Sequence, residues 1–334
     1  MAFPIELILY AFLVVIALTI AQLRDLFGAA MLTGIFSLLA AGLFTLMDAV
    51  DVAFTEAAVG AGISTVLILV TLSLTEEREG HPRRQIVPLA IVAVTGVALV
   101  YATLDMPSYG DPAAPIHRHV APHYLLQSPD EIGLPNVVTA VLASYRGFDT
   151  LGELMVILTA GIAVMLVLGI HPRSTERRRG QTETTPRMRM RMREKMVLRV
   201  VSKRFIPFVL LFGLYVQAHG DFGPGGGFQA GVIFAAGLIL YAMIFGIEEL
   251  KRVVPPRVAE FGAAVGALLF GGIGVLTVLL GGNYLDYGLL DVHEPAHGQH
   301  LGILGVELGV GITVAAVMVT IYFGFASRSS GEPS

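Results

Sequence analysis

The fold is decided by one stretch, His219-Gly-Asp-Phe-Gly-Pro-Gly-Gly-Gly-Phe-Gln-Ala-Gly231, which lies between two apolar runs. The runs, 200–218 and 228–247, are each long enough to cross a bilayer core of ~30 Å. Glycines allow backbone angles that other residues avoid, and Pro224 fixes one φ angle and lacks an N–H donor. The stretch predicts a sharp, re-entrant-looking turn at the membrane surface, with His219 and Asp221 beside it. The simpler alternative is an ordinary Gly/Pro turn between two helices.

The composition is typical of a membrane protein. Hydrophobic residues make up 54% of the 334-residue chain and charged residues only 14%, whereas soluble domains carry ~25% charged residues. The chain has no cysteine, which excludes disulfides, a thiolate nucleophile and cysteine-ligated clusters within it. We therefore expect no cofactor. The N-terminus lacks the basic region of a secretory signal, so we expect the first apolar run to remain as a helix.

Nine apolar runs have the length of a transmembrane helix. They cover residues 5–22, 26–47, 55–74, 86–104, 150–170, 200–218, 227–247, 258–280 and 301–325. With the N-terminus outside, 20 of the 22 Lys and Arg residues fall in cytoplasmic segments, as the positive-inside rule requires. The sequence therefore predicts an all-α integral membrane protein with about nine transmembrane helices. Its N-terminus lies outside and its C-terminus in the cytoplasm, in a multi-pass arrangement in the cell (inner) membrane.

The segments between the runs predict four regions. Residues 1–80 form a first membrane module, residues 81–170 a second, 171–196 a basic cytoplasmic linker, and 197–334 a third module. The proline-rich segment 105–135 has no helical or strand period, so we expect an ordered external loop. Its histidines, His117, His119 and His123, form at best a weak metal motif, and we expect no metal. After it, Asn136 can cap a short interfacial helix. The linker is expected to be solvated near anionic lipid rather than to bind nucleic acid.

Carboxylates within the spans are the candidate ion-carrying groups. A charged side chain at mid-bilayer costs at least ~2.5–3.5 kcal/mol, so it usually faces a partner or a wet pathway. A buried carboxylate can exchange a proton for a cation. Glu56 opens the third span, Glu153 lies in the fifth, and Glu307 lies two turns into the ninth. The alternatives are stabilisation of a helix N-terminus for Glu56 and Glu153, and interhelical bonding for Glu307. The candidate ion-path residues are Asp48, Asp51, Glu56, Asp149, Glu153, His219 and Glu307.

A formal zinc-protease pattern, His293-Glu-Pro-Ala-His297, precedes the last span. That chemistry needs both imidazoles on one face of a helix, and Pro295 would break a helix interior. We expect these residues to line an external vestibule with His300, and we expect no catalytic residue. Gly227, Gly262 and Gly305 each have a second glycine four positions on, a spacing that lets helices pack closely.

The glycine stretch resembles the signature loop of the B subunit (MnhB-like) of the Mrp multisubunit sodium/proton antiporters. In that loop a His-Gly pair precedes a Pro-Gly-Gly-Gly-Phe run, and the likeness extends over about 197–325. Residues 5–75, with Leu23-Arg-Asp-Leu-Phe-Gly-Ala-Ala30 and the 51–62 motif, resemble the C-terminal membrane region of the A-type protein, which is related to the J-type subunit of complex I. Residues 86–170, with the 147–153 motif, look like its continuation. The resemblance implies a B subunit fused behind an A-type tail.

The resemblance also implies roles for individual residues. In the B-type loop His219, Pro224, Gly225, Gly226, Gly227 and Phe228 would shape the structure that supports antiport. In the A-type part Glu56, Asp149 and Glu153 would lie on or beside an ion path. The long antiporter-like part of the A-type protein, with its lysines, has no counterpart here, so we expect the chain to act only within a complex.

The implied function is that of a transporter subunit rather than an enzyme. It would belong to a sodium/proton antiporter driven by the proton-motive force. The expected partners are small hydrophobic subunits, an A-type antiporter-like subunit, Na+, H+ and membrane lipids, with no nucleic acid. Two alternatives stay open: a membrane-arm subunit of a complex I-like or membrane-bound hydrogenase ion pump, and a structural scaffold subunit.

Overall fold

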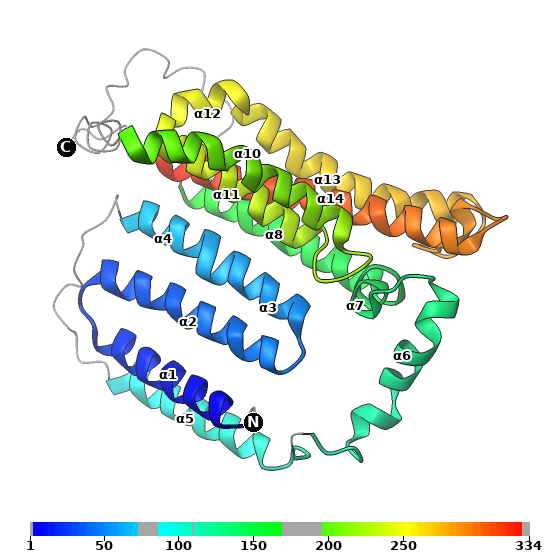
Figure 1. The fold of residues 1–334 in the computed structure, drawn as a ribbon, viewed down its shortest axis with the longest axis horizontal. Coiled ribbons are helices and arrows are strands. Elements are labelled where there is room, and N and C mark those ends of the chain that lie inside the picture. The colour runs from blue at the N-terminus through cyan, green and yellow to red at the C-terminus, as the bar shows by residue number, and fades with distance from the viewer. Residues whose placement is uncertain (1–2, 73–85, 109, 169–195, 329–334) are drawn as a thin grey trace.

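The computed structural model describes residues 3–72, 86–108, 110–168 and 196–328, and every regular element within these ranges is helical (Figure 1). Nine helices in these ranges are long and apolar enough to cross a membrane. They are Pro4–Gln22, Leu26–Leu46, Val50–Leu72, Ile86–Thr103, Gly147–Val167, Arg199–His219, Gly227–Phe245, Pro256–Leu279 and Pro295–Ala326. The predicted all-α membrane architecture is confirmed, with the predicted number of spans. The basic linker, apart from Met196, lies outside the described residues.

The first three spans pack around α2. α1 (Phe3–Gln22) leads into α2 (Leu26–Leu46), whose N-cap Asp25 accepts a hydrogen bond from the Gly28 N–H at 3.1 Å. The third span is composite: α3 (Val50–Glu56), a π-helical segment η1 (Ala57–Ser64) and α4 (Thr65–Leu72), all in contact with α2. The prediction that Glu56 opens this span was wrong, because the helix already begins at Val50. Asp51 is tolerated in its first turn, where the helix dipole favours a negative charge.

The fourth span and then a long connection follow the third span. α5 (Ile86–Thr103) has no buried residue in its spanning window, and α6 (Val120–Glu131), preceded by the 3-10 turn η2 (Pro115–Arg118), leads from it toward the main bundle (Figure 1). The expectation of a segment without helical structure over 105–135 was wrong. Pro122 lies in the first turn of α6, where its missing N–H has no intrahelical partner to lose. Pro129 lies close to the C-terminal end of the helix.

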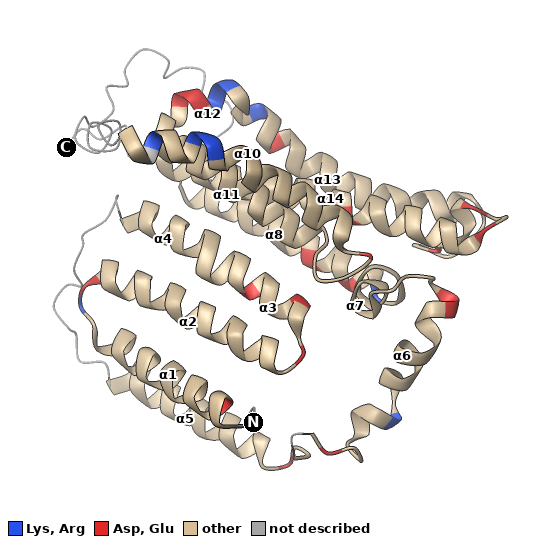
Figure 2. Ribbon diagram, in the orientation of Figure 1, with Lys and Arg blue, Asp and Glu red and all other residues tan. Residues whose placement is uncertain are grey.

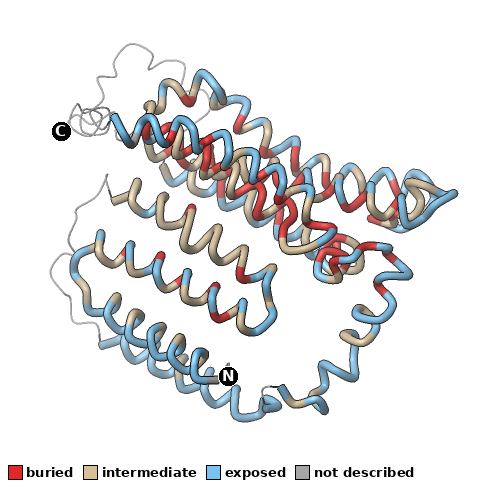
Figure 3. Tube along the Cα trace, viewed as in Figure 1, coloured by how far each residue is buried: buried red, intermediate tan, exposed pale blue. Residues whose placement is uncertain are grey.

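The remaining helices form a bundle around α14 (Pro295–Arg328). α14 packs against α8 (Gly147–Val167), α10 (Met196–His219), α11 (Gly227–Phe245) and α13 (Pro256–Leu279). Phe270, Ile303 and Val314 are fully buried between these helices, and the buried residues gather in this bundle while α1 and α5 are exposed along their length (Figure 3). Short elements complete it: α7 (Val137–Thr139), η3 (Ala140–Tyr145), α12 (Ile247–Val253) and η4 (Tyr287–Leu290).

The last span begins earlier than the sequence predicts. α14 starts at Pro295 rather than near residue 301, because a proline in the first position of a helix loses no hydrogen bond and has a suitable φ angle. Since a helix has ~3.6 residues per turn, Glu307 lies about three turns into α14 rather than two. The change of start brings His300 onto the helix, on the approach to Glu307.

Candidate functional site

The glycine stretch folds into a tight turn between α10 and α11. The N–H groups of Phe222 and Gly223 donate to the His219 carbonyl at 2.9 and 3.0 Å, and the Gly226 N–H donates to the Val216 carbonyl at 3.0 Å. Gly226 has a φ of +103°, which disfavours any side chain. A methyl group on Gly225 would come within 2.6 Å of the Val216 carbonyl oxygen. The backbone of the turn is therefore closed onto the last turn of α10 at positions that only glycine fits.

A second segment holds this turn in place. Asn136 Oδ1 accepts from the Val138 N–H at 2.9 Å, so Asn136 caps α7 as predicted. Its amide nitrogen Nδ2 donates to the carbonyls of Gly220 and Gly223, each at 3.0 Å, and Thr139 Oγ1 donates to the Gly220 carbonyl at 2.7 Å. The cap is predictable from the local sequence, whereas the contacts with the turn are not, because their partners lie far along the chain.

Replacing Asn136 by alanine is expected to destabilise the turn. The change removes an N-cap worth ~1 kcal/mol and two hydrogen bonds worth ~1 kcal/mol each, so we expect a loss of about 2–3 kcal/mol. The loss of stability is measured as a fall in the thermal midpoint of the detergent-solubilised protein, which size-exclusion chromatography monitors.

The matched control is Asn136→Ser, which keeps an oxygen able to cap α7 but is too short to donate to Gly220 and Gly223. We expect its thermal midpoint to fall between those of wild type and Asn136→Ala. Equal midpoints for the serine and alanine variants would assign the whole effect to the turn contacts. A wild-type midpoint for Asn136→Ala would show that neither contact stabilises the fold.

The carboxylate of Glu307 lies against this turn. A methyl group on Gly220 would come within 2.9 Å of Glu307 Oε2, and one on Gly226 within 2.9 Å of Glu307 Oε1. A methyl group on Gly227 would overlap the Glu307 backbone carbonyl, so α11 and α14 touch at this level. Glu307 Oε2 is buried and has no hydrogen-bond partner within the described part of the chain. A buried carboxyl oxygen of this kind can hold a proton or a cation.

Asp221, in the turn itself, is a second acidic residue of this site. Its side chain is 5% exposed, and its Oδ2 lies 2.7 Å from Nδ1 of His300 on α14. Burial raises the pKa of Asp221, and the neighbouring His300 opposes that rise. Its other oxygen, Oδ1, is buried without a partner among the described residues. The turn thus brings together two acidic groups, Asp221 and Glu307, each with one unpaired buried oxygen.

His219 is the last residue of α10, where the turn begins. Its ring stacks on Tyr215 with centroids 5.0 Å apart, and a methyl group on Gly223 would come within 3.0 Å of His219 Nε2. Pro224 is half-buried, and Phe228, at the start of α11, packs against the hydrophobic core. These residues of the stretch shape the turn, while Asp221 is the member that faces α14 through His300.

The acidic residues of α3 approach the same region. Thr55 accepts a hydrogen bond from Gln229 Nε2 of α11 at 2.9 Å, and the charge of Asp51 acts on the Glu307 carboxylate, as does that of Asp221. Glu56 lies one position beyond Thr55, and a methyl group on Gly60 would come within 2.6 Å of its Oε1. The π-helical segment η1 begins directly after Glu56, and such segments are frequent at functional sites.

The other predicted ion-path residues lie elsewhere. Asp149 is exposed and accepts from Arg146 Nε at 2.6 Å, and Glu153 is exposed on α8. Asp48 is exposed in the turn before α3, with a φ of +59°. The described structure therefore places Glu307 against the glycine turn, joins α3 to α11 through Thr55 and Gln229, and leaves Asp48, Asp149 and Glu153 on the surface of this chain.

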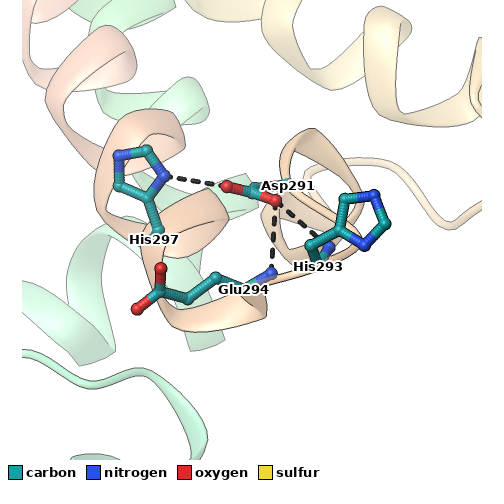
Figure 4. A network of polar contacts seen from close by, with 4 residues as sticks. All are labelled: Asp291, His293, Glu294 and His297. Carbon is teal, nitrogen blue, oxygen red and sulfur yellow. Dashed lines mark hydrogen bonds and ion pairs between the residues drawn. The ribbon is translucent and has the colours of Figure 1, made fainter.

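The segment with the zinc-protease pattern has a structural role in the described structure. Asp291 Oδ1 accepts from the backbone N–H groups of His293 and Glu294 at 3.1 and 3.2 Å, and its Oδ2 lies 2.9 Å from His297 Nδ1 (Figure 4). These bonds lower the pKa of Asp291, the His297 contact most. Among the described residues no group of His, Asp and Glu has the arrangement of a metal site. His123 instead pairs with Glu131, Nε2 to Oε2, at 3.3 Å.

Comparison with known sequence families gives three matches along the chain. A domain described as related to the MnhB subunit of Na+/H+ antiporters matches residues 197–320. Families described as the D and E subunits of MBH match residues 11–77 and 81–179. The glycine turn, Asp221 and Glu307 thus fall in the MnhB match, Asp51 in the first MBH match and Asn136 in the second.

Two relatives match this chain over different lengths. The protein called antiporter subunit mnhB2 of Staphylococcus haemolyticus is 32% identical over 136 residues, which is 40% of this chain and 96% of the relative. A protein of Rhizobium meliloti, described as the A/B component of a K+/H+ antiporter, is 27% identical over 320 residues, which is 87% of this chain. The chain spans 31% of the length of that second relative.

Two solved structures share the fold. A chain in the Mrp complex from Dietzia sp. DQ12-45-1b matches 96% of this chain with a TM-score of 0.75 and 24% identity, and 34% of that chain is covered. A chain in the membrane-bound sulfane sulfur reductase, an archaeal respiratory membrane complex, matches 73% of this chain with a TM-score of 0.55 and 25% identity, and is 98% covered.

The nine apolar spans and the bundle around α14 define a multi-pass protein of the cell membrane. Within that class the chain belongs to the MnhB family of antiporter subunits, with a further membrane region fused in front of its MnhB domain.

Proposed function

We propose that this chain is a subunit of a multisubunit cation/proton antiporter driven by the proton-motive force, and that it acts as a transporter component rather than an enzyme. The observation that carries the proposal is the buried, unpaired carboxyl oxygen of Glu307 against the glycine turn. The family membership supports it, as does the protein of Rhizobium meliloti in which A and B parts occur together. The expected partners are small hydrophobic subunits together with an A-type antiporter-like protein, and the exchanged ions are Na+ and H+.

The proposed ion path runs along the group formed by Asp51, Glu307 and the turn from His219 to Gly227. Glu56 extends it into the third span, where a π-helical segment follows the carboxylate. Asp48, Asp149 and Glu153 are exposed on this chain, so in the complex they would face a neighbouring protein across the border of the path. Glu153 lies within the spanning helix α8, where a charge against lipid is costly, and this supports a partner protein rather than lipid as its neighbour.

We also propose the orientation with the N-terminus outside and the C-terminus in the cytoplasm. Lys251, Arg252 and Arg257, on α12 and the start of α13, lie at one end of the bundle with the basic residues at the start of α10 (Figure 2). Cytoplasmic ends of membrane helices carry an excess of Lys and Arg. The glycine turn follows the other end of α10, which would place it at the external side.

A second candidate function is a membrane-arm subunit of a complex I-like or hydrogenase-type ion pump. The observation that favours it is the match of residues 11–77 and 81–179 to subunits of MBH. The fold shared with a chain of the sulfane sulfur reductase points the same way. Redox centres would then lie in partner proteins, because this chain has no cysteine.

Mass spectrometry of the proteins that co-purify with this chain from its own membranes in mild detergent tests the proposal. Recovery of small hydrophobic subunits together with an A-type protein, without iron–sulfur proteins, is the expected result. In vesicles that contain the reconstituted complex, added Na+ should then change the internal pH. Recovery of cluster-bearing proteins would favour the redox-driven pump, and recovery of the chain alone would contradict both.

A further inference from the structure

We propose that His300 and Asp221 form a proton-relay pair that connects the exposed surface beside the glycine turn to the buried carboxylate of Glu307. The inference rests on the proposed function and adds to it the residues that deliver the proton. The signature loop alone does not point to it, because Asp221 has its partner on α14, far along the chain from the turn.

The first observation is a gradient of exposure along the pair. The His300 side chain is 40% exposed, whereas that of Asp221 is 5% exposed, and Nδ1 of the one lies 2.7 Å from Oδ2 of the other. The imidazole has a second ring nitrogen, Nε2, that remains for exchange with water. A histidine is the side chain best suited to such a position, because its ordinary pKa lies close to neutral pH.

The second observation is the pair of unpaired oxygens behind His300. Asp221 Oδ1 and Glu307 Oε2 are both buried, and neither has a hydrogen-bond partner within the described ranges. A methyl group on Gly220, the residue next to Asp221, would come within 2.9 Å of Glu307 Oε2. The charge of Asp221 also acts on Glu307. An unpaired buried polar group is costly, so two of them at one turn indicate a functional rather than a stabilising arrangement.

The transfer balances with one proton and no electron. His300 gains a proton at Nε2 and gives the proton on Nδ1 to Oδ2 of the ionised Asp221, which leaves a neutral imidazole with its proton on Nε2. Exchange of that proton with water restores the starting tautomer before the next transfer. The two carboxyl groups are not hydrogen-bonded to each other, so the resulting carboxylic acid of Asp221 passes its proton to the Glu307 carboxylate through a water molecule between their unpaired oxygens. Because burial raises the pKa of Asp221, its protonated form is accessible and the step does not require a strong acid.

Other titratable groups surround this pair. Asp51 on α3 acts on Glu307, and His219 at the end of α10 lies against Gly223 of the turn. A comparable pair, His297 with Asp291, lies at the start of the same helix α14 with the two side chains 2.9 Å apart. In that pair His297 is 51% exposed and Asp291 28% exposed, so both side chains are open to solvent, whereas Asp221 is buried. The pair of His297 and Asp291 provides a matched control.

The test measures Na+-dependent proton movement with a pH-sensitive dye in vesicles that contain the assembled complex. His300→Ala should slow exchange by about 100-fold, the lower end of the effect of losing a general acid–base group. Added imidazole should restore a large part of the rate, because it can occupy the vacated, exposed site. His297→Ala should exchange close to the wild-type rate and should not respond to imidazole.

Two further variants separate a relay from a structural role. His300→Gln keeps a polar group beside Asp221 but cannot carry a proton, so it should assemble and still be slow. Asp221→Asn should be slow and insensitive to imidazole, since the group that receives the proton is missing. Recovery of the whole complex after purification is compared for every variant.

The outcomes distinguish this proposal from the function on which it rests. Wild-type exchange without any loss in His300→Gln and Asp221→Asn would overturn the relay and leave the antiporter function intact. A slow His300→Ala variant that imidazole does not restore would also overturn it and assign His300 a structural role. Absence of Na+-dependent proton movement in the wild-type complex would contradict the proposed function itself.

Discussion

Replacing Glu307 by glutamine is expected to reduce cation/proton exchange to the background of vesicles without the complex. Glutamine keeps the shape that packs against Gly220 and Gly226 but can neither release a proton nor attract a cation. Because the buried oxygen of Glu307 has no partner in the described structure, the substitution removes no hydrogen bond, and we expect the complex to assemble normally. Dye-based measurement of Na+-dependent proton movement, normalised to the amount of complex recovered, checks this.

The matched control is Glu260→Gln on α13, another carboxylate within a spanning helix. Its charged neighbour is Arg257 on the same helix, at the basic end of the bundle (Figure 2), and it does not contact the glycine turn. Exchange in this variant should stay close to wild type. Undiminished exchange in Glu307→Gln, with the complex intact, would exclude Glu307 from the ion path and favour a scaffolding role for the chain.

Replacing Gly266 by alanine is expected to prevent stable packing of α13 on α14. A methyl group at this position would come within 2.5 Å of the Gly309 carbonyl oxygen and 2.8 Å of the Thr313 backbone nitrogen. Both contacts are to backbone, so the helices must separate rather than a side chain rotate. Overpacking of this kind typically costs ~1–3 kcal/mol. We expect a lower thermal midpoint of the purified protein and a smaller yield of assembled complex.

Gly272→Ala on the same helix is the control, because a methyl group there would meet no atom within 4 Å. Alanine is a better helix former than glycine by roughly 0.5–1 kcal/mol in a helix interior, so this variant should be as stable as wild type or slightly more stable. If Gly266→Ala had the same thermal midpoint and the same yield of assembled complex as Gly272→Ala, close approach of α13 and α14 would not be required for assembly.

The spans and their number could be predicted from the sequence for a physical reason. In lipid every backbone polar group must be paired within the segment, so an apolar run of spanning length has one main solution, the helix. The cap at Asn136 was predictable because capping is local. The helix α6 was not, since the prolines of 105–135 suggested an irregular loop, whereas Pro122 occupies a first turn where proline is tolerated.

The site was only partly predictable. Glu307 was identified because a charge within a spanning run is conspicuous. The roles of Asp221 and His300 were missed, because their pairing depends on where α14 begins and on how it packs against the turn. The π-helical segment after Glu56 was also missed, because the two glycines of the run Ala57–Ser64 lower the helix propensity without identifying a π-helix. The Asp221–His300 pairing and the π-helical segment both depend on contacts between residues far apart in the chain. The periodicity of the sequence does not reveal such contacts.

The contacts of Asn136 with the glycine turn have a consequence for how the protein is made. Asn136 and its partners are separated by 84 and 87 positions in the chain. At a synthesis rate of ~5–20 residues per second, Asn136 leaves the ribosome roughly 4–17 s before the turn that it binds. The span α8 must insert and α10 must follow before the contact can form. Closure of this contact is therefore a late step of biogenesis, and it joins the front part of the fused chain to the part that carries the glycine turn.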